Sequence, residues 1–162
     1  MHAVLMTEKI LTSNAIEAAH RAEATAILIL AGFRVYRPEA DVSGEDLVIR
    51  TPGGALRVVQ MKSRPTVELS RYSGRSLWML FPDPKGPKPG RPWYLIKHDV
   101  LYDWVKKRHG AAKGWKNAWS YPSVSADLRK FLRPFLLARV GGAQRRSKEP
   151  RTPGALRASQ RR

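Results

Sequence analysis

Cysteine is absent from this chain of 162 residues, and long apolar runs are absent too. The lack of cysteine excludes disulfides, thiolate metal sites and cysteine nucleophiles, and it favours a reducing compartment. The longest mostly apolar run, residues 24–33, is far below the roughly 20 residues that a membrane-spanning helix requires, and the first residues do not have the order of a signal peptide. We therefore expect a soluble, cytoplasmic protein with no membrane partner.

Acidic residues are also scarce. Thirteen Asp and Glu stand against thirty Lys and Arg, which gives a formal net charge of +17. Such a charge attracts a polyanion over long distances and makes its binding depend steeply on salt. Nucleic acid is the partner that this balance favours. An Arg-rich composition imposed by a high-GC genome, or a role at a membrane surface, would produce the same excess of basic residues.

The basic residues continue into a C-terminal segment, residues 141–162, that has almost no large apolar side chain. It contains seven basic residues and one acidic residue among several Gly, Pro and Ser. A segment of this composition cannot bury enough apolar surface to offset the entropy lost on ordering. We expect a folded domain over residues 1–140, followed by a disordered basic tail that either contacts phosphates or is simply solvated.

The pattern of apolar residues predicts a helix, a group of strands and further helices. Thr12 or Ser13 is expected to cap a helix that ends at Gly32. Two more helices are predicted, one capped by Asp99 and running to about His109, and one over 126–140 with a kink at Pro134. Strands are predicted at 33–37, 46–50, 55–63, 76–81 and 92–97. The expected fold class is α/β, with a central mixed sheet of four or five strands flanked by helices.

Three polar residues stand where two of these strands are expected to pair. Side chains alternate along a strand, so Gln60 and Lys62 share one face, and a suitable register brings Asp46 of the preceding strand beside them. Asp46 and the Gln60 carbonyl can ligate magnesium, which prefers oxygen donors. Lys62 can hold the attacking water and offset charge on a phosphate.

Other interpretations of these residues stay open. Gln60 and Lys62 could line the solvated face of an edge strand, and Asp46 could be a turn residue at the strand start. In a different register, Asp41 or Glu45 would be the ligand. Without further context, a [D/E/Q]-x-K tripeptide is expected by chance about once in a chain of this length.

Three segments supply that context: "AGFRVYRP" after the first helix, "GEDLVI" with Asp46, and "LRVVQMKS" with Gln60 and Lys62. Together they resemble the PD-(D/E)XK phosphodiesterase superfamily, which includes restriction enzymes, Holliday-junction resolvases and some homing endonucleases. The resemblance covers about residues 13–108 and implies a restriction-endonuclease-like domain. It matches Asp46 to the family Asp, and Gln60 and Lys62 to the E-x-K motif, with Gln in the first place, a substitution known in the superfamily.

The resemblance also implies a glutamate on the first helix, about three turns before the glycine and therefore near Arg21. Glu17 lies four residues from Arg21 and shares its face, whereas Glu23 is rotated from it by about 200° at about 100° per residue. Periodicity favours Glu17, and a small difference in helix length would favour Glu23. Either glutamate could instead serve only the solubility of the helix, and His20 is a weaker candidate because it lies three residues from Glu17.

Several residues downstream of the candidate site are suited to phosphate contact. The predicted nucleic-acid-binding residues are Arg64, Arg71, Tyr72 and Arg75 after the site strand, and Lys85 and Lys88 in the Pro- and Gly-rich loop at 82–91. Trp115 and Trp119 are expected mainly to pack, with stacking on bases as the alternative.

These inferences together predict an endonuclease that hydrolyses DNA through a water activated by Mg²⁺, for which Mn²⁺ could substitute. Asp46, Gln60 and Glu17 are the expected metal ligands, with Lys62 and either Glu17 or Glu23 completing the catalytic group. Cleavage of both strands would require a homodimer. Two alternatives are a DNA-binding module on the same fold that has lost cleavage and a basic RNA-binding protein.

Overall fold

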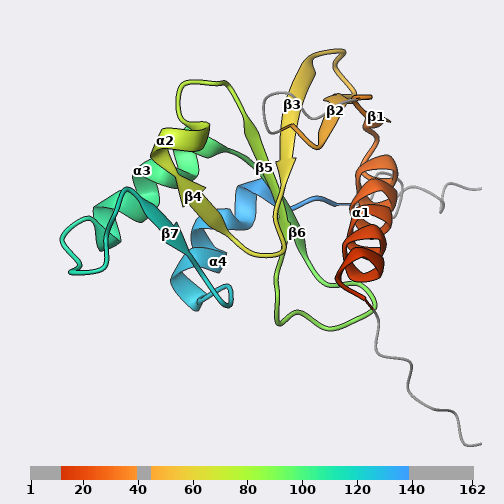
Figure 1. Cartoon of the computed structure of the whole chain (residues 1–162). Coiled ribbons are helices and arrows are strands. Elements are labelled where there is room, and N and C mark those ends of the chain that lie inside the picture. The colour runs from red at the N-terminus through yellow and green to blue at the C-terminus, as the bar shows by residue number, and fades with distance from the viewer. Residues whose placement is uncertain (1–11, 40–44, 139–162) are drawn as a thin grey trace, which may run out of the picture.

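One mixed sheet forms the centre of the described structure, which is a computed structural model covering residues 12–39 and 45–138 (Figure 1). The strand order is β1-β2-β3-β5-β6, with β3 parallel to β5 and all other neighbours antiparallel. The strands are β1 Arg34–Tyr36, β2 Leu47–Arg50, β3 Leu56–Met61, β5 Trp78–Pro82 and β6 Trp93–Lys97. The α/β class and the five-stranded mixed sheet are therefore confirmed, and the predicted tail at 141–162 lies outside the described residues.

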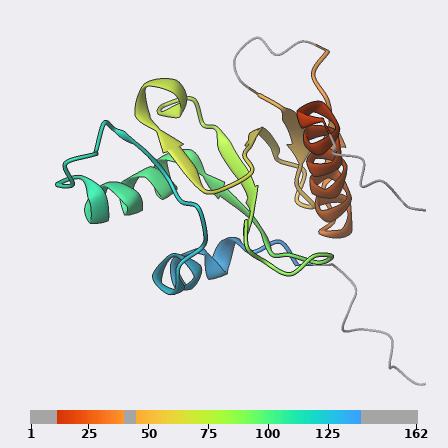
Figure 2. The ribbon, with the colours of Figure 1, turned by 60° about the horizontal axis from the view of Figure 1, so that its bottom comes forward.

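Helices cover the sheet from both sides. Helix α1 (Ser13–Leu30) lies on one side, and α3 (His98–His109) and α4 (Ala126–Leu132) lie on the other, as both ribbon views show (Figures 1 and 2). The Thr12 hydroxyl accepts a hydrogen bond from the backbone N–H of Ala15 at 3.3 Å, which caps α1 as predicted. Gly32 follows the helix with a φ of 86°, a conformation that favours glycine.

Strand alternation separates two apolar cores. On the α1 side, Ala24 and Leu28 of the helix pack in a cluster whose sheet residues include Leu47, Ile49 and Val59. On the other side, α3 and α4 pack against the alternate residues of β5 and β6, which are Met79, Phe81, Tyr94 and Ile96. Strands β5 and β6 are thus buried on both faces, whereas β1, β2 and β3 contribute buried apolar residues only to the α1 side.

A second, two-stranded sheet was not predicted. Strands β4 (Thr66–Glu68) and β7 (Ala118–Ser120) pair antiparallel, and the single-turn helix α2 (Leu69–Tyr72) directly follows β4. Each of these elements has only three or four residues, which is too few for a hydrophobic period to become visible. They lie on the α3 side of the molecule, and α2 carries one of the basic residues singled out above, Arg71.

Two predicted helix boundaries were wrong. The last helix ends at Leu132 instead of continuing to residue 140, and Pro134 lies in the 3₁₀ turn η1 (Arg133–Phe135) that follows, because proline cannot supply the N–H that a continuing α-helix needs. Helix α3 begins at His98, and its N-cap is Lys97. Asp99 is therefore inside the first turn, where its carboxylate accepts a hydrogen bond from the Gly74 N–H at 3.4 Å.

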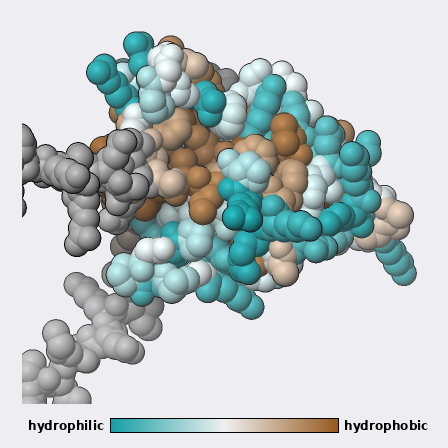
Figure 3. All heavy atoms as spheres, turned by 180° about the vertical axis from the view of Figure 1, so that it is seen from behind, coloured by the Kyte–Doolittle hydropathy of each residue, from teal (hydrophilic) through white to brown (hydrophobic). Residues whose placement is uncertain are grey.

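The surface of the described part is mixed in character. Seen from behind, hydrophobic residues gather near the centre and hydrophilic residues lie around the rim (Figure 3). None of the helices in residues 12–39 and 45–138 is both long and apolar enough to cross a membrane.

Candidate functional site

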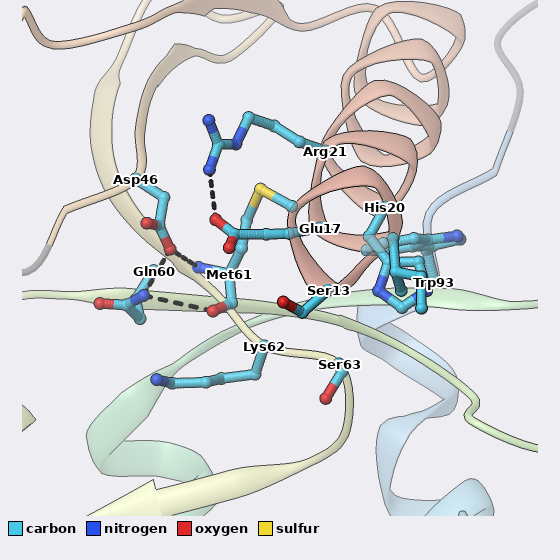
Figure 4. Close-up of a pocket in the computed structure, with 11 residues that line it drawn as sticks. Ser13, Glu17, His20, Arg21, Asp46, Gln60, Met61, Lys62, Ser63 and Trp93 are labelled. Carbon is cyan, nitrogen blue, oxygen red and sulfur yellow. Dashed lines mark hydrogen bonds and ion pairs between the residues drawn. The ribbon is translucent and has the colours of Figure 1, made fainter. Parts of the chain in front are cut away.

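The register of β2 and β3 brings Asp46 and Gln60 together. Leu47 pairs with Val59, so Asp46 and Gln60 are opposite one another at the next position. The Gln60 side-chain Nε2 donates a hydrogen bond to Asp46 Oδ2, and the backbone N–H of Met61 donates to the same oxygen at 2.7 Å (Figure 4). The Asp46 backbone N–H donates to the Val59 carbonyl at 2.9 Å and holds the start of β2 in place.

Lys62 continues the same face beyond the end of β3. Its backbone N–H donates to the Leu80 carbonyl at 2.9 Å, which extends the parallel pairing with β5 and preserves the strand alternation. Its ammonium lies 5.4 Å from the centroid of the Tyr72 ring, within reach of a cation–π interaction. None of the ion pairs among the described residues includes Lys62, so no described carboxylate neutralises its charge at salt-bridge distance.

A cavity of about 470 Å³ lies between these strand ends and the first half of α1. Glu17 lines it, and its carboxylate forms an ion pair with Arg21 at 2.5 Å. Figure 4 shows both side chains extending from α1 toward Asp46. The full lining comprises Ser13, Ile16, Glu17, His20, Arg21, Asp46, Gln60, Met61, Lys62, Ser63 and Trp93. The structure therefore brings Asp46, Gln60, Lys62 and Glu17 to one hollow.

Glu23 has a different environment and does not line this cavity. Its carboxylate accepts hydrogen bonds from Arg91 Nε at 2.9 Å, Arg91 Nη2 at 2.6 Å and Trp93 Nε1 at 3.0 Å. The Arg91 side chain is only 2% exposed, so Glu23 is the counter-ion of a buried guanidinium. Burial alone raises the pKa of Glu23, but the hydrogen bonds from Arg91 and Trp93 outweigh it, and the net pKa lies below 4.5. Its predicted place in the catalytic group does not fit this geometry.

His20 also lines the cavity, on the wall formed by α1. Burial lowers the pKa of His20, and the positive charges of Arg91 and Lys88 lower it further. The lowered pKa disfavours the charged imidazolium at neutral pH. This makes it a poor counter-ion for phosphate at neutral pH.

Tyr72 does not fit its predicted contact with nucleic acid. It is 1% exposed, and its ring packs edge-on against His98 at 5.4 Å between ring centroids. Its contact with Lys62 instead gives it a place beneath the candidate site. The residue is buried because α2 turns it inward, against a cluster that also contains Leu101 and Val105.

The other predicted phosphate contacts are all exposed, and none of them lines the cavity; they are Arg64, Arg71, Arg75, Lys85 and Lys88.

The two tryptophans that were expected mainly to pack do so. Trp119 is half-buried and stacks on His109 at 4.3 Å between ring centroids, while Trp115 packs against the Tyr102 ring at 5.8 Å. The two indoles also pack against each other at 6.4 Å between ring centroids, so both belong to one aromatic cluster, which accords with the expected packing role.

The donor set at the cavity suits a hard divalent cation. Asp46 and Glu17 supply carboxylate oxygens. The Gln60 side-chain nitrogen faces Asp46 and its oxygen points away (Figure 4), so Gln60 supplies an amide oxygen only after its side chain rotates. Among residues 12–39 and 45–138, no group of three or more His, Cys, Asp or Glu could hold a metal ion by itself. Magnesium commonly keeps several waters and binds through one or two carboxylates together with substrate phosphates, so this sparse set fits that ion.

Sequence reasoning missed the role of Arg21 at this site. Glu17 and Arg21 share a helix face, and their i, i+4 spacing is the one that favours an ion pair.

The alternatives to Asp46 do not gain support, because Glu45 does not line the cavity and Asp41 lies outside the described residues.

Three comparisons were made, against models of protein families, curated proteins and solved structures, and none of them finds a match.

Replacing the two glutamates of α1 separately should distinguish their roles. Glu23→Gln leaves the buried Arg91 without its counter-ion, and we expect the free energy of unfolding to fall by roughly 2–3 kcal/mol, below the usual cost of breaking a fully buried pair because Glu23 is one-third exposed. Glu17→Gln removes an exposed i, i+4 pair and should change it by no more than about 0.5 kcal/mol. Urea unfolding at pH 7 measures both.

The pH dependence supplies a second check. Because the folded-state pKa of Glu23 is depressed, its stabilisation is fully present above the ordinary value of 4.5 and is lost as pH falls through the folded-state pKa. The gap between wild type and Glu23→Gln should therefore close at acid pH. A gap that is constant from pH 7 to pH 3, or equal losses for the two variants at pH 7, would contradict this assignment.

Proposed function

We propose that the chain is a magnesium-dependent endonuclease of the PD-(D/E)XK kind, which hydrolyses DNA phosphodiester bonds. The observation that carries this proposal is the convergence of Asp46, Gln60, Glu17 and Lys62 at one cavity. Carboxylate and amide oxygens stand there beside an ammonium group that no described acid neutralises. In a protein with a net charge of +17, a polyanionic substrate is the one that would approach this cavity fastest.

The metal would be held by Asp46, by the Gln60 amide oxygen and by Glu17. A bound divalent ion supplies a water of lowered pKa and neutralises charge on the phosphate. Asp46 is already fixed for this task, because the Met61 N–H orients one of its carboxylate oxygens. Gln60 is 7% exposed and anchored in β3, so metal binding requires its amide to rotate, and it also requires Glu17 to exchange its pair with Arg21 for the ion.

Lys62 and Arg21 supply the positive charge at the phosphate. The Lys62 ammonium can orient the attacking water by hydrogen bonding and offset the charge that develops on the phosphate oxygens. Its backbone is fixed by pairing with β5, and its ammonium lies 5.4 Å from the centroid of the Tyr72 ring, so both help to position it for a phosphate. Arg21 has a planar guanidinium that matches two phosphate oxygens, and it lies beside Glu17 at the opposite wall.

DNA is the proposed partner. The exposed cations Arg64, Arg71, Lys85 and Lys88 would contact the DNA backbone without reading its sequence. One site hydrolyses one strand, so cleavage of both strands at one place would require a homodimer.

A DNA-binding module that has lost cleavage is the second candidate. It is favoured by a specific observation, since Gln60 is neutral and at present donates to Asp46 rather than offering its oxygen. In such a module the Asp46 and Gln60 pair would only join two strands, and binding would not depend on a divalent ion.

Nicking of supercoiled plasmid separates the two functions. Wild-type protein should nick plasmid in Mg²⁺ or Mn²⁺, and Lys62→Ala should lower the rate by about 10²-fold or more while DNA binding is retained, because the lost charge acts mainly on the transition state. Lys106→Ala, an exposed lysine of α3, is the matched control and should keep the wild-type rate. Catalysis is disproved if plasmid, branched DNA and single-stranded DNA all stay intact over a wide range of both metals.

A gain of charge at Gln60 tests the metal ligands directly. Gln60→Glu gives the site a further carboxylate, and we expect the magnesium concentration for half-maximal nicking to fall by about tenfold. Ala112→Glu adds the same charge on an exposed loop and should not shift it. An unchanged magnesium requirement in Gln60→Glu would mean that residue 60 does not face the ion.

A further inference from the structure

One face of β1, β2 and β3 is not packed against any helix of the described structure. The cluster under α3 and α4 contains no residue of these three strands, and their buried apolar residues face α1. The outward residues, which we call the open sheet face, are Arg34, Tyr36, Val48, Arg50, Leu56 and Val58. Among them Leu56 is 60% exposed, Tyr36 44% and Val58 38%, which is an unusual amount of apolar side chain to leave bare on one sheet.

The open sheet face is continuous with the candidate site. Cross-strand pairing arranges it in rows, with Tyr36, Val48 and Val58 in one row and Arg34, Arg50 and Leu56 in the next. Asp46 and Gln60 form the row on the other side of the apolar one, because residues two apart on a strand share a face. A ligand lying along the strands would thus meet the Asp46 site, then an apolar row, then two arginines about 13 Å from Asp46.

The two arginines form an arrangement that favours an anion. Arg34 and Arg50 are direct cross-strand partners, and like charges in that position destabilise a sheet. None of the ion pairs among the described residues includes either one. They border a hollow of about 340 Å³ that is also lined by Gly32, Thr51, Pro52 and Gly54. A phosphate there would relieve the repulsion and accept paired hydrogen bonds from either guanidinium.

We propose that the open sheet face binds an unpaired segment of DNA, with a backbone phosphate between Arg34 and Arg50 and a base stacked on Tyr36, which directs the strand to the site at Asp46. The proposal rests on the proposed function and specifies its substrate as DNA with a single-stranded region. Paired bases are hidden inside a duplex, whereas unpaired bases offer their faces to exposed aromatic and apolar side chains. The cations at one end of this face complement the phosphates of the strand.

A second copy of the chain is a less suitable occupant. In a two-fold dimer the same patch meets itself, so Arg34 and Arg50 of both copies would lie in one interface. Bringing four cations together costs free energy that the apolar row would have to overcome, whereas a nucleic acid strand makes favourable contacts with the two arginines of a single copy.

Fluorescence anisotropy in EDTA tests the open sheet face without any catalysis. The double substitution Arg34→Gln with Arg50→Gln should weaken binding of a labelled oligothymidine by about tenfold or more and reduce the slope of log affinity against log salt by about 0.7, the value for one phosphate of a single strand. Tyr36→Ala should weaken it by about tenfold through lost stacking. Blunt duplex of equal length should lose less than threefold in each case.

Lys106→Gln with Lys107→Gln removes two exposed cations from α3 and is the matched control, expected to weaken oligothymidine binding less than threefold. Equal losses for the control and the arginine variant, or equal losses for duplex and single strand, would overturn the proposal. The proposal would also be overturned if Tyr36→Ala changed the molar mass measured by light scattering but kept its affinity for oligothymidine, since the open sheet face would then join two copies of the chain. If wild-type protein nicks no DNA yet shows the predicted losses, the proposed catalysis fails and this binding site stands.

Discussion

The pairing of β2 with β3 is the constraint on which the candidate site depends. With Leu47 opposite Val59, the apolar residues of both strands face α1, and Asp46 and Gln60 meet on the other side. A slip of one residue in either strand would move its apolar residues to the uncovered face and turn Asp46 away from Gln60. The same burial that stabilises the α1 core therefore fixes the distance between the two proposed metal ligands, and the hydrogen bond from the Met61 N–H orients the carboxylate.

Helix α1 contributes to stability and to the site through different residues. Glu23 neutralises the buried Arg91 and joins the helix to the chain before β6, so it is committed to the fold. Glu17 lies nearly two turns earlier, where its exposed pair with Arg21 can be exchanged for another partner at little cost. The proposed function uses the glutamate whose ion pair is weak, since only that one can turn toward a metal without unfolding its surroundings.

Local sequence patterns were sufficient for the central sheet, because apolar residues such as Leu47, Ile49 and Val59 alternate along its strands. They put Asp46 beside Gln60 only for a suitable register, and that register is fixed by the pairing of Leu47 with Val59. They could not decide between Glu17 and Glu23, since the residue that decides it, Arg91, is 68 positions away from Glu23. Tyr72 was expected at the surface because the single turn of α2 that buries it leaves no periodic signal. The open sheet face also escaped prediction, because it depends on where α3 and α4 pack and not on the strands themselves.

The most direct test of the account is whether a divalent ion binds between Asp46 and Gln60. In an NMR titration of ¹⁵N-labelled protein with Mn²⁺, paramagnetic broadening should appear first at the Gln60 side-chain amide and at the Met61 backbone N–H, which both donate hydrogen bonds to Asp46. Excess Mg²⁺ should reverse the broadening, and Asp46→Asn should prevent it. Sharp signals at Gln60 and Met61 in the presence of Mn²⁺, whether or not other signals broaden, would contradict the proposed metal site and the hydrolytic function that depends on it.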